Sequence, residues 1–200
     1  MIEIEKKFSL DAAQKMRLLE GAQFLKKKTF TDIYFDTKDH SLILKDFWLR
    51  RRDDIFELKT PHHKDKKHFI YQYDEIVEEK EIRKRLTLPA KGDMKSDLQR
   101  AGYTSFCVCT TERESYQVGP FIIDLDHVTY KDDDLTYNLA EVELMTSESE
   151  AEQATGKILE FAKHKGLHMG DVTGKIVCYL KLQKPDIYRT LCKAQGVENL

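Results

Sequence analysis

The sequence carries ionic side chains at alternate positions in several short segments, and the sign of the charge differs between segments. Arg50, Arg52 and Lys59 lie in two neighbouring cationic segments. The anionic segments contain Glu3, Glu5, Asp124, Asp126, Glu141 and Glu143. Guanidinium and ammonium groups bind phosphate oxygens, whereas clustered carboxylates repel one another unless they hold a hard divalent cation such as Mg²⁺. Together the two sets are typical of a site for a polyanion such as a triphosphate.

The composition excludes several classes of protein. The 200 residues contain 33 Lys+Arg against 35 Asp+Glu, a formal net charge of −2, so the basic excess of a general nucleic-acid binder is missing. No run approaches the roughly 18 apolar residues of a membrane span, and the charged start of the chain differs from a signal peptide. We therefore expect a cytoplasmic protein without a nucleic-acid or membrane partner. The cysteines lack the spacing of a zinc site and are expected to be buried, reduced thiols: Cys107, Cys109, Cys178 and Cys192.

Alternation with a period of two dominates the chain and predicts strands with two chemically different faces. Strands are expected over residues 1–8, 29–36, 46–52, 55–60, 69–75, 105–118, 120–127 and 136–146. Helical spacing is expected over residues 10–20, 75–86, 93–101, 149–165 and 186–194. Residues 172–183 fit a strand or a helix, and the spacing of Ile176, Tyr179 and Leu180 favours a helix. The histidine- and lysine-rich segment 61–69 is expected to be a variable loop. This pattern favours an α+β fold built on an antiparallel sheet, with residues 1–200 in one domain.

Two interpretations of the alternating charge are open. A sheet with one solvated face and one core face produces the same pattern, and for any single strand that is the simpler interpretation. Across the set, however, the alternate positions are almost purely charged, and the charges are segregated by sign. Trp48 shares a face with Arg50 and Arg52 in this pattern. If the sheet closes into a barrel, the charged faces line one lumen.

At this point the sequence resembles a known family, the CYTH or triphosphate tunnel superfamily. Glu3-Ile4-Glu5-Lys6-Lys7 fits the Glu-x-Glu-x-Lys signature with which that family opens. Further matching segments follow in the family's order: Tyr34-Phe35-Asp36-Thr37, Trp48-Leu49-Arg50-Arg51-Arg52, Glu57-Leu58-Lys59, Asp124-Leu125-Asp126, Glu141-Val142-Glu143 and Gly174-Lys175. The resemblance covers residues 1–190, and within the superfamily the chain is most similar to the soluble thiamine triphosphatases of animals.

The resemblance implies a closed antiparallel eight-stranded β-barrel with a central tunnel, against which the helices of residues 172–194 pack. The phosphate-binding cations that it implies are Arg50, Arg52, Lys59, Arg113 and Lys175. The acidic residues from which it draws Mg²⁺ ligands are Glu3, Glu5, Asp124, Asp126, Glu141 and Glu143. Lys7 and Tyr34 match a pair that activates the attacking water, Trp48 matches an aromatic residue that packs on thiamine, and Glu75 matches a further acidic position.

The function that the resemblance implies is Mg²⁺-dependent hydrolysis of thiamine triphosphate to thiamine diphosphate and phosphate by a monomeric enzyme. Two alternatives stay open: a tunnel enzyme that acts on inorganic or nucleoside triphosphates, and a noncatalytic polyphosphate-binding module. Because lysine and tyrosine have reference pKa values of about 10, a water-activating pair of Lys7 and Tyr34 predicts an alkaline rate optimum.

Overall fold

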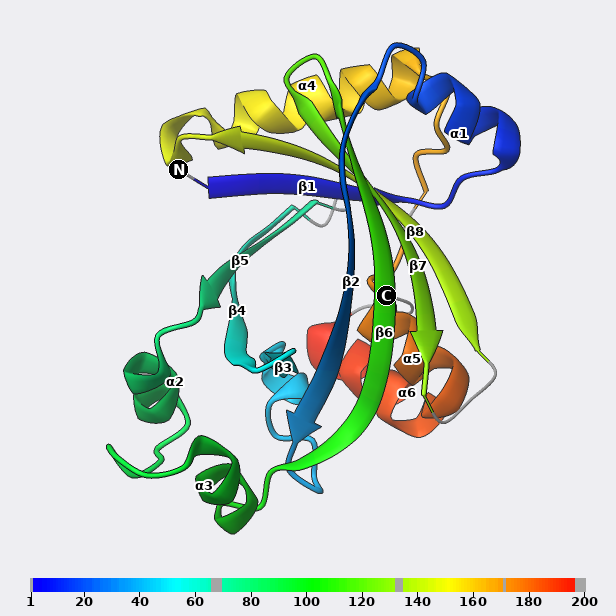
Figure 1. Ribbon diagram of the computed structural model, residues 1–200. Coiled ribbons are helices and arrows are strands. Elements are labelled where there is room, and N and C mark those ends of the chain that lie inside the picture. Colours follow the sequence, from blue (N-terminus) through cyan, green and yellow to red (C-terminus); the bar gives the residue numbers. More distant parts are fainter. Residues whose placement is uncertain (1, 66–69, 132–134, 171, 197–200) are drawn as a thin grey trace.

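The centre of the molecule is a strongly curled antiparallel sheet of eight strands (Figure 1). This computed structural model describes residues 2–65, 70–131, 135–170 and 172–196. The strands are β1 (Ile2–Phe8), β2 (Gln23–Asp36), β3 (Trp48–Arg52), β4 (Ile55–Asp65), β5 (Ile70–Ile76), β6 (Thr104–Val118), β7 (Phe121–Tyr130) and β8 (Thr136–Thr146). The predicted α+β fold with an eight-stranded antiparallel sheet is confirmed.

Strand β1 has a pairing partner on each side. Neighbouring strands follow the order β1-β5-β4-β3-β2-β6-β7-β8, and β1 also pairs with β8. The β1–β8 ladder extends from Ile2 opposite Thr146 to Phe8 opposite Ala140. By contrast, β1 meets β5 in the register pair Glu5 and Tyr71. The ladder between β1 and β8 is therefore long and regular, whereas the pairing between β1 and β5 is short.

Three segments differ from the sequence prediction. Strand β2 begins at Gln23 because the lysine-rich residues before Thr29 pair with β6, where Lys27 Nζ lies 3.1 Å from Glu112 Oε2. Residues 61–65 of the predicted loop extend β4, so the loop prediction is wrong there; residues 66–69 lie outside the described residues. The helix expected over 75–86 starts only at Glu79, because β5 continues to Ile76.

Helices pack on part of the outer face and on one end of the sheet, and the inner face carries charged residues. They are α1 (Ala12–Leu18), α2 (Glu79–Arg85), α3 (Met94–Arg100), α4 (Ala151–His164), α5 (Lys175–Gln183) and α6 (Pro185–Gln195), with two short 3₁₀ helices, Ile43–Lys45 and Glu148–Glu150. Ile158 of α4 belongs to a buried apolar cluster with Ile4 and Val142. Ile82 of α2 belongs to a second cluster, with Leu49 and Leu58. The alternate residues of these strands are thereby free to face inward.

The C-terminal helices α5 and α6 pack across one end of the curled sheet, as Figure 1 shows. Pro185 occupies the first turn of α6, where its missing N–H costs no hydrogen bond. Ile176 of α5 and Leu191 of α6 form a third apolar cluster with Tyr34 and Tyr130. The prediction of a helix over 172–183 is confirmed from Lys175 onward. This packing brings the first residue of α5 to the inner face of the sheet.

Two further findings concern the classes of protein considered above. Among the described residues, we find no helix with the length and hydropathy that a membrane crossing requires. All four cysteines are buried free thiols, as the sequence predicted.

Candidate functional site

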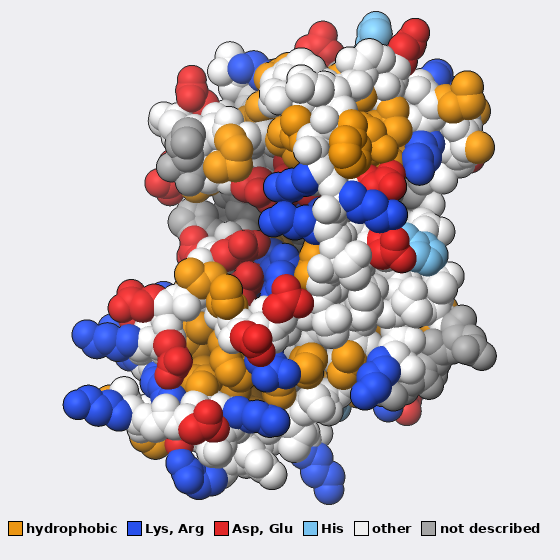
Figure 2. All heavy atoms as spheres, viewed as in Figure 1, with side chains coloured by type: hydrophobic (Ala, Val, Ile, Leu, Met, Phe, Trp, Pro, Cys, Tyr) orange, Lys and Arg blue, Asp and Glu red, His pale blue; other side chains and the backbone are white. Residues whose placement is uncertain are grey.

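The inner face of the sheet lines a cavity of about 330 Å³. Figure 2 shows it as a hollow between the part of the molecule that carries α4 and the part that carries α2 and α3, with acidic and basic side chains along it. The predicted site residues that line it are Glu3, Glu5, Lys7, Tyr34, Trp48, Arg50, Arg52, Lys59, Arg113, Asp126, Glu141, Glu143 and Lys175. Asp124 is buried beside the cavity, in a carboxylate group with Glu141 and Glu143. The structure therefore brings the predicted residues together, while their individual roles stay predictions.

The antiparallel register explains why these side chains meet. Glu5 of β1 lies opposite Glu143 of β8, and Lys7 lies opposite Glu141. On the next strand, Asp124 of β7 also lies opposite Glu141. Because directly opposed residues on one face of a sheet have their Cβ atoms about 5 Å apart, alternate ionic residues on adjacent strands form continuous charged surfaces.

One of these surfaces, which we call the cationic wall, consists of Arg50 and Arg52 of β3 and Lys175 of α5. The guanidinium of Arg50 lies 2.5 Å from Glu57 Oε1, and its side chain is almost buried. Arg52 Nε lies 2.8 Å from Asp32 Oδ1 on β2. Cations held by carboxylates in this way keep unused N–H groups that can bind a phosphate oxygen.

Lys59 and Glu75 form a neighbouring ion pair at the edge of the cavity. They occupy opposed positions on β4 and β5, and the ammonium of Lys59 contacts the carboxylate of Glu75. Both side chains line the cavity. Lys59 is thus placed to extend the cationic wall, and Glu75 balances its charge.

The opposite surface, the acidic wall, carries Glu3, Glu5, Asp124, Asp126, Glu141 and Glu143. It contains two groups of three carboxylates whose oxygen atoms lie within 4.8 Å of one another. One group is Glu3, Glu5 and Glu143, and the other is Asp124, Glu141 and Glu143. Glu143 therefore belongs to both groups.

Arg113 pairs with carboxylates of the acidic wall, as Lys7 does. Its Nε donates to Asp126 Oδ1 at 2.6 Å, its Nη2 donates to Glu141 Oε2 at 2.6 Å, and its Nη1 contacts Asp124. Sequence reasoning grouped Arg113 with the phosphate-binding cations. In the structure it pairs with carboxylates of the acidic wall, and its Cζ lies 5.9 Å from the centre of the Phe30 ring, which Arg52 and Lys175 also approach. Its role in phosphate binding stays a prediction.

The remaining carboxylate charge is large enough to change protonation. Burial, together with the charge of Glu5, raises the pKa of Glu3 to about 7. Burial, together with Glu3 and Asp124, raises the pKa of Glu143 to about 9. Asp124 Oδ1 is buried and has no hydrogen-bond partner within the described parts of the chain. Oxygen ligands, crowded negative charge and an unsatisfied buried oxygen are the features that a divalent cation would relieve.

Lys7 and Tyr34 reach the cavity from different surroundings. Lys7 contacts Glu5, and its Nζ lies 3.4 Å from Glu141 Oε1. Burial disfavours its charge, but these two carboxylates outweigh burial and hold the pKa of Lys7 above the usual lysine value. Tyr34 is buried on β2, and burial together with the charge of Asp32 raises the pKa of its hydroxyl. In these surroundings Lys7 carries a proton and Tyr34 is neutral at physiological pH.

Trp48 lies at the end of the cavity beside two polar residues that sequence reasoning missed. Its Nε1 donates to Asp46 Oδ1 at 3.0 Å, and Tyr73 Oη donates to the same oxygen at 3.2 Å. Asp46, Trp48 and Tyr73 all line the cavity. Asp46 has a positive φ of 61°, a conformation that aspartate tolerates better than most residues. The arrangement places an indole and a carboxylate next to the cationic wall. Trp48 lies two residues before Arg50 on β3, and Asp46 precedes that strand.

Comparisons with known proteins agree with this geometry. The family model described as the CYTH domain matches residues 1–175. The chain is 30% identical over 217 aligned positions to a thiamine-triphosphatase of Macaca fascicularis, covering 98% of this chain and 91% of the relative. It is 29% identical to a thiamine-triphosphatase of Homo sapiens, with the same coverage.

Solved structures show the same fold at lower identity. The protein named PH1819 from Pyrococcus horikoshii OT3 superposes with a TM-score of 0.63 at 21% identity, covering 90% of this chain and 98% of that one. HpAC1 from Hippeastrum, described as an adenylyl cyclase candidate with a dominant triphosphatase activity, gives a TM-score of 0.55 at 20% identity, covering 94% and 96%.

Proposed function

Since the chain belongs to the CYTH domain family, we propose that it hydrolyses thiamine triphosphate to thiamine diphosphate and phosphate in this cavity, with Mg²⁺ as cofactor. The observation that carries the proposal is the meeting of a cationic wall and a carboxylate-rich wall around one cavity. The names of the two primate relatives support thiamine triphosphate as the substrate. The proposal includes a tunnel closed along β1 and β5, whose support is the register pair of Glu5 and Tyr71.

In the proposed reaction, water attacks the terminal phosphorus, and the bond between that phosphorus and the bridging oxygen breaks. Such a transfer depends mostly on positioning and on neutralising the charge of the phosphate oxygens. Arg50, Arg52, Lys59 and Lys175 would bind and orient the chain of phosphates. Carboxylates lie behind or beside their guanidinium and ammonium groups and balance the positive charge.

The acidic wall would hold Mg²⁺ through members of its two carboxylate groups. A bound Mg²⁺ would neutralise charge on the phosphate oxygens and usually keeps several of its waters. Asp124, Glu141 and Glu143 are the ligands that we favour, because this group includes the unsatisfied Oδ1 of Asp124. Arg113 would fix the orientation of Asp126 and Glu141 beside them.

Lys7 and Tyr34 stay our candidates for activating water, with one condition that the sequence did not reveal. Glu5 and Glu141 favour the ammonium form of Lys7. A general-base role would therefore require the charge of these carboxylates to be taken up by a metal cation, which inverts the local effect on pKa. As an ammonium, Lys7 would instead donate to a phosphate oxygen.

At the other end of the cationic wall, Trp48 and Asp46 would receive the thiamine group. An indole face attracts a cation such as a thiazolium ring, and the attraction is worth about 1–2 kcal/mol in a desolvated site. The carboxylate of Asp46 adds a negative charge at the same place. This surrounding favours a cationic organic group over an uncharged one.

A phosphate-release assay on thiamine triphosphate, ATP and inorganic tripolyphosphate tests the proposal. Each substrate is measured with Mg²⁺ and again with excess EDTA. We expect release to depend on Mg²⁺ and kcat/KM to be highest for thiamine triphosphate. If kcat/KM were equal for tripolyphosphate, thiamine triphosphate would no longer be the proposed specific substrate. If tripolyphosphate bound but no phosphate were released from any of the three compounds, the protein would be a noncatalytic binding module.

A further inference from the structure

The carboxylate of Asp32 lies behind the cationic wall. Asp32 is on β2, and its side chain is 0% exposed. It is absent from the residues that line the cavity, so it has no direct path to a bound substrate. Asp32 lies within the strand that the sequence predicts over residues 29–36, and sequence reasoning gave it no role.

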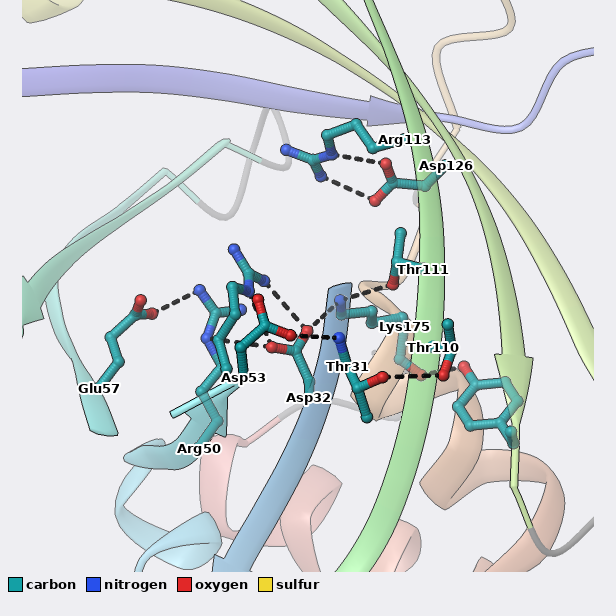
Figure 3. Close-up of polar contacts among 12 residues, drawn as sticks. Thr31, Asp32, Arg50, Asp53, Glu57, Thr110, Thr111, Arg113, Asp126 and Lys175 are labelled. Atoms are coloured by element: carbon teal, nitrogen blue, oxygen red, sulfur yellow. Dashed lines mark hydrogen bonds and ion pairs between the residues drawn. The ribbon is translucent and has the colours of Figure 1, made fainter. Parts of the chain in front are cut away.

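Three cations from two elements converge on this carboxylate (Figure 3). Arg52 binds it with both arms of its guanidinium, Nε to Oδ1 at 2.8 Å and Nη2 to Oδ2 at 3.0 Å. Lys175 Nζ, from the first residue of α5, lies 2.5 Å from Oδ2. Arg50 Nε lies 3.9 Å from Oδ1. Asp32 therefore contacts every member of the cationic wall.

Two further side chains, those of Phe30 and Thr111, contact Arg52 or Lys175. Phe30 precedes Asp32 by two positions and shares its face of β2. Arg52 Cζ lies 4.0 Å from the centre of the Phe30 ring, and Lys175 Nζ lies 4.9 Å from it. Lys175 Nζ also donates to Thr111 Oγ1 of β6 at 3.0 Å. Arg52 and Lys175 thus rest on side chains that do not line the cavity.

Without a shared counter-charge these cations would repel one another, because unit charges a few ångströms apart interact strongly in a partly buried site. A bidentate carboxylate also restricts the orientation of a guanidinium more than a single hydrogen bond does. Burial opposes the charge of Asp32, but Arg52 and Lys175 outweigh it, so the pKa of Asp32 is far below its usual value. The carboxylate is accordingly ionised across the whole physiological range.

From this geometry we propose that Asp32 is a positioning residue, which holds Arg50, Arg52 and Lys175 in the arrangement that a triphosphate requires. The proposal rests on the proposed function of the cavity and adds to it a residue that does not touch the substrate. It predicts that the loss of Asp32 slows the reaction even though the cavity becomes more positive.

The competing explanation is that Asp32 only stabilises the fold, and the chain offers a matched control for it. Asp97 of α3 is also a buried carboxylate, 2% exposed, with two arginine partners. Arg83 Nη1 lies 2.7 Å from Asp97 Oδ2, and Arg100 contacts Oδ1. Neither Asp97 nor its partners line the cavity. Asp97→Asn should therefore report the cost of losing a buried ion pair without affecting the site.

The experiment compares wild type, Asp32→Asn and Asp97→Asn. Tripolyphosphate is titrated by calorimetry in EDTA, where the stoichiometry gives the folded fraction, and kcat and KM are measured with Mg²⁺. For Asp32→Asn we expect kcat per folded molecule to fall about 10- to 100-fold, the range typical of residues that orient binding groups. The dissociation constant of tripolyphosphate should change by less than about threefold, because lost orientation and removed negative charge oppose each other. Asp97→Asn should keep kcat per folded molecule.

A second variant and a spectroscopic measurement cover the case in which Asp32→Asn does not fold. Asp32→Glu keeps the charge that neutralises the cations but moves its oxygens, so we expect kcat to fall there too. In ¹⁵N-labelled protein, the Nε–H signals of Arg50 and Arg52 should be sharp in wild type and Asp97→Asn and broadened in both Asp32 variants. This readout does not require catalysis, so it tests Asp32 even if no substrate is hydrolysed. Wild-type kcat and unchanged arginine signals in the Asp32 variants would overturn the proposal.

Discussion

The two walls of the cavity balance their charge in opposite ways. On the cationic wall, each cation has a carboxylate partner within the protein, and Asp32 serves three of them. On the acidic wall, Arg113 faces several carboxylates at once, and the surplus raises the pKa of Glu143 to about 9, by burial and by the charges of Glu3 and Asp124. The cationic wall is therefore preorganised, whereas the acidic wall carries an excess of negative charge that a bound cation would offset.

This difference has a consequence for binding. A preorganised site binds its ligand without first having to order its own side chains. We therefore expect inorganic tripolyphosphate to bind through the cationic wall even without a metal ion, and the acidic wall to contribute once Mg²⁺ is present. Variants on the two walls should fail in different assays.

The largest effect is expected from Glu143→Gln, because Glu143 belongs to both carboxylate groups. Loss of one charged ligand from a site that neutralises the transition state should lower the Mg²⁺-dependent kcat about 10³-fold. Tripolyphosphate binding in EDTA should persist. The control is Glu112→Gln, an exposed carboxylate that pairs with Lys27 on the same sheet; comparable losses in both variants would contradict the two-wall comparison.

Arg52→Ala is the corresponding change on the cationic wall. Its side chain is 31% exposed, so the fold should tolerate the loss. We expect kcat/KM to fall about 10²-fold, as when one well-placed donor to a transition state is removed. In contrast to Glu143→Gln, tripolyphosphate should also bind more weakly in EDTA, which calorimetry measures directly. Unchanged affinity would mean that the preorganised wall does not bind phosphate.

The alternation of charged and apolar residues along the strands predicts part of the site. Period-two alternation identifies which residues share a face, and the face of Glu3 and Glu5 lines the cavity, as does that of Arg50 and Arg52. The resemblance to a family supplied the closed arrangement that joins those faces. Together the alternation and the resemblance predict that these residues share one cavity, and the structure brings them together there.

The supporting residues could not be found in that way. Asp32 meets Arg52 through the register of β2 and β3, and it meets Lys175 across 143 positions of the chain. Neither contact can be recognised from the spacing of residues along the sequence. Asp46 reaches the cavity through a left-handed backbone conformation after a short 3₁₀ helix, which strand parity does not predict. The alternation of residue types predicts which side chains share a face of a strand. Which faces of different strands meet depends on the pairing register and on tertiary packing.

A smaller and more selective effect is expected at the aromatic end of the cationic wall. Trp48→Leu removes the indole face but keeps an apolar side chain. We expect kcat/KM for thiamine triphosphate to fall about 5- to 30-fold, the equivalent of about 1–2 kcal/mol of cation–π attraction. Tripolyphosphate, measured in the same variant, serves as the internal control. Equal losses on both substrates would make Trp48 a packing residue, in accordance with its membership of the apolar cluster.

The smallest effect is expected from a change of pH, which should affect the charge of Lys175 but not that of the arginines of the cationic wall. Burial lowers the pKa of Lys175 below the usual lysine value, although Asp32 and Cys109 oppose the shift, while Arg50 adds to it. A group that loses its positive charge as the pH rises binds anions more weakly. The dissociation constant of tripolyphosphate in EDTA should therefore increase about threefold to fivefold between pH 8 and 10, since part of one charged hydrogen bond is lost. Lys175→Arg stays charged over this interval, so its profile should show only the change caused by the ionisation of tripolyphosphate and of Glu143, which both proteins share. The wild-type increase is measured relative to that profile, and identical pH profiles would show that Lys175 keeps its proton up to pH 10.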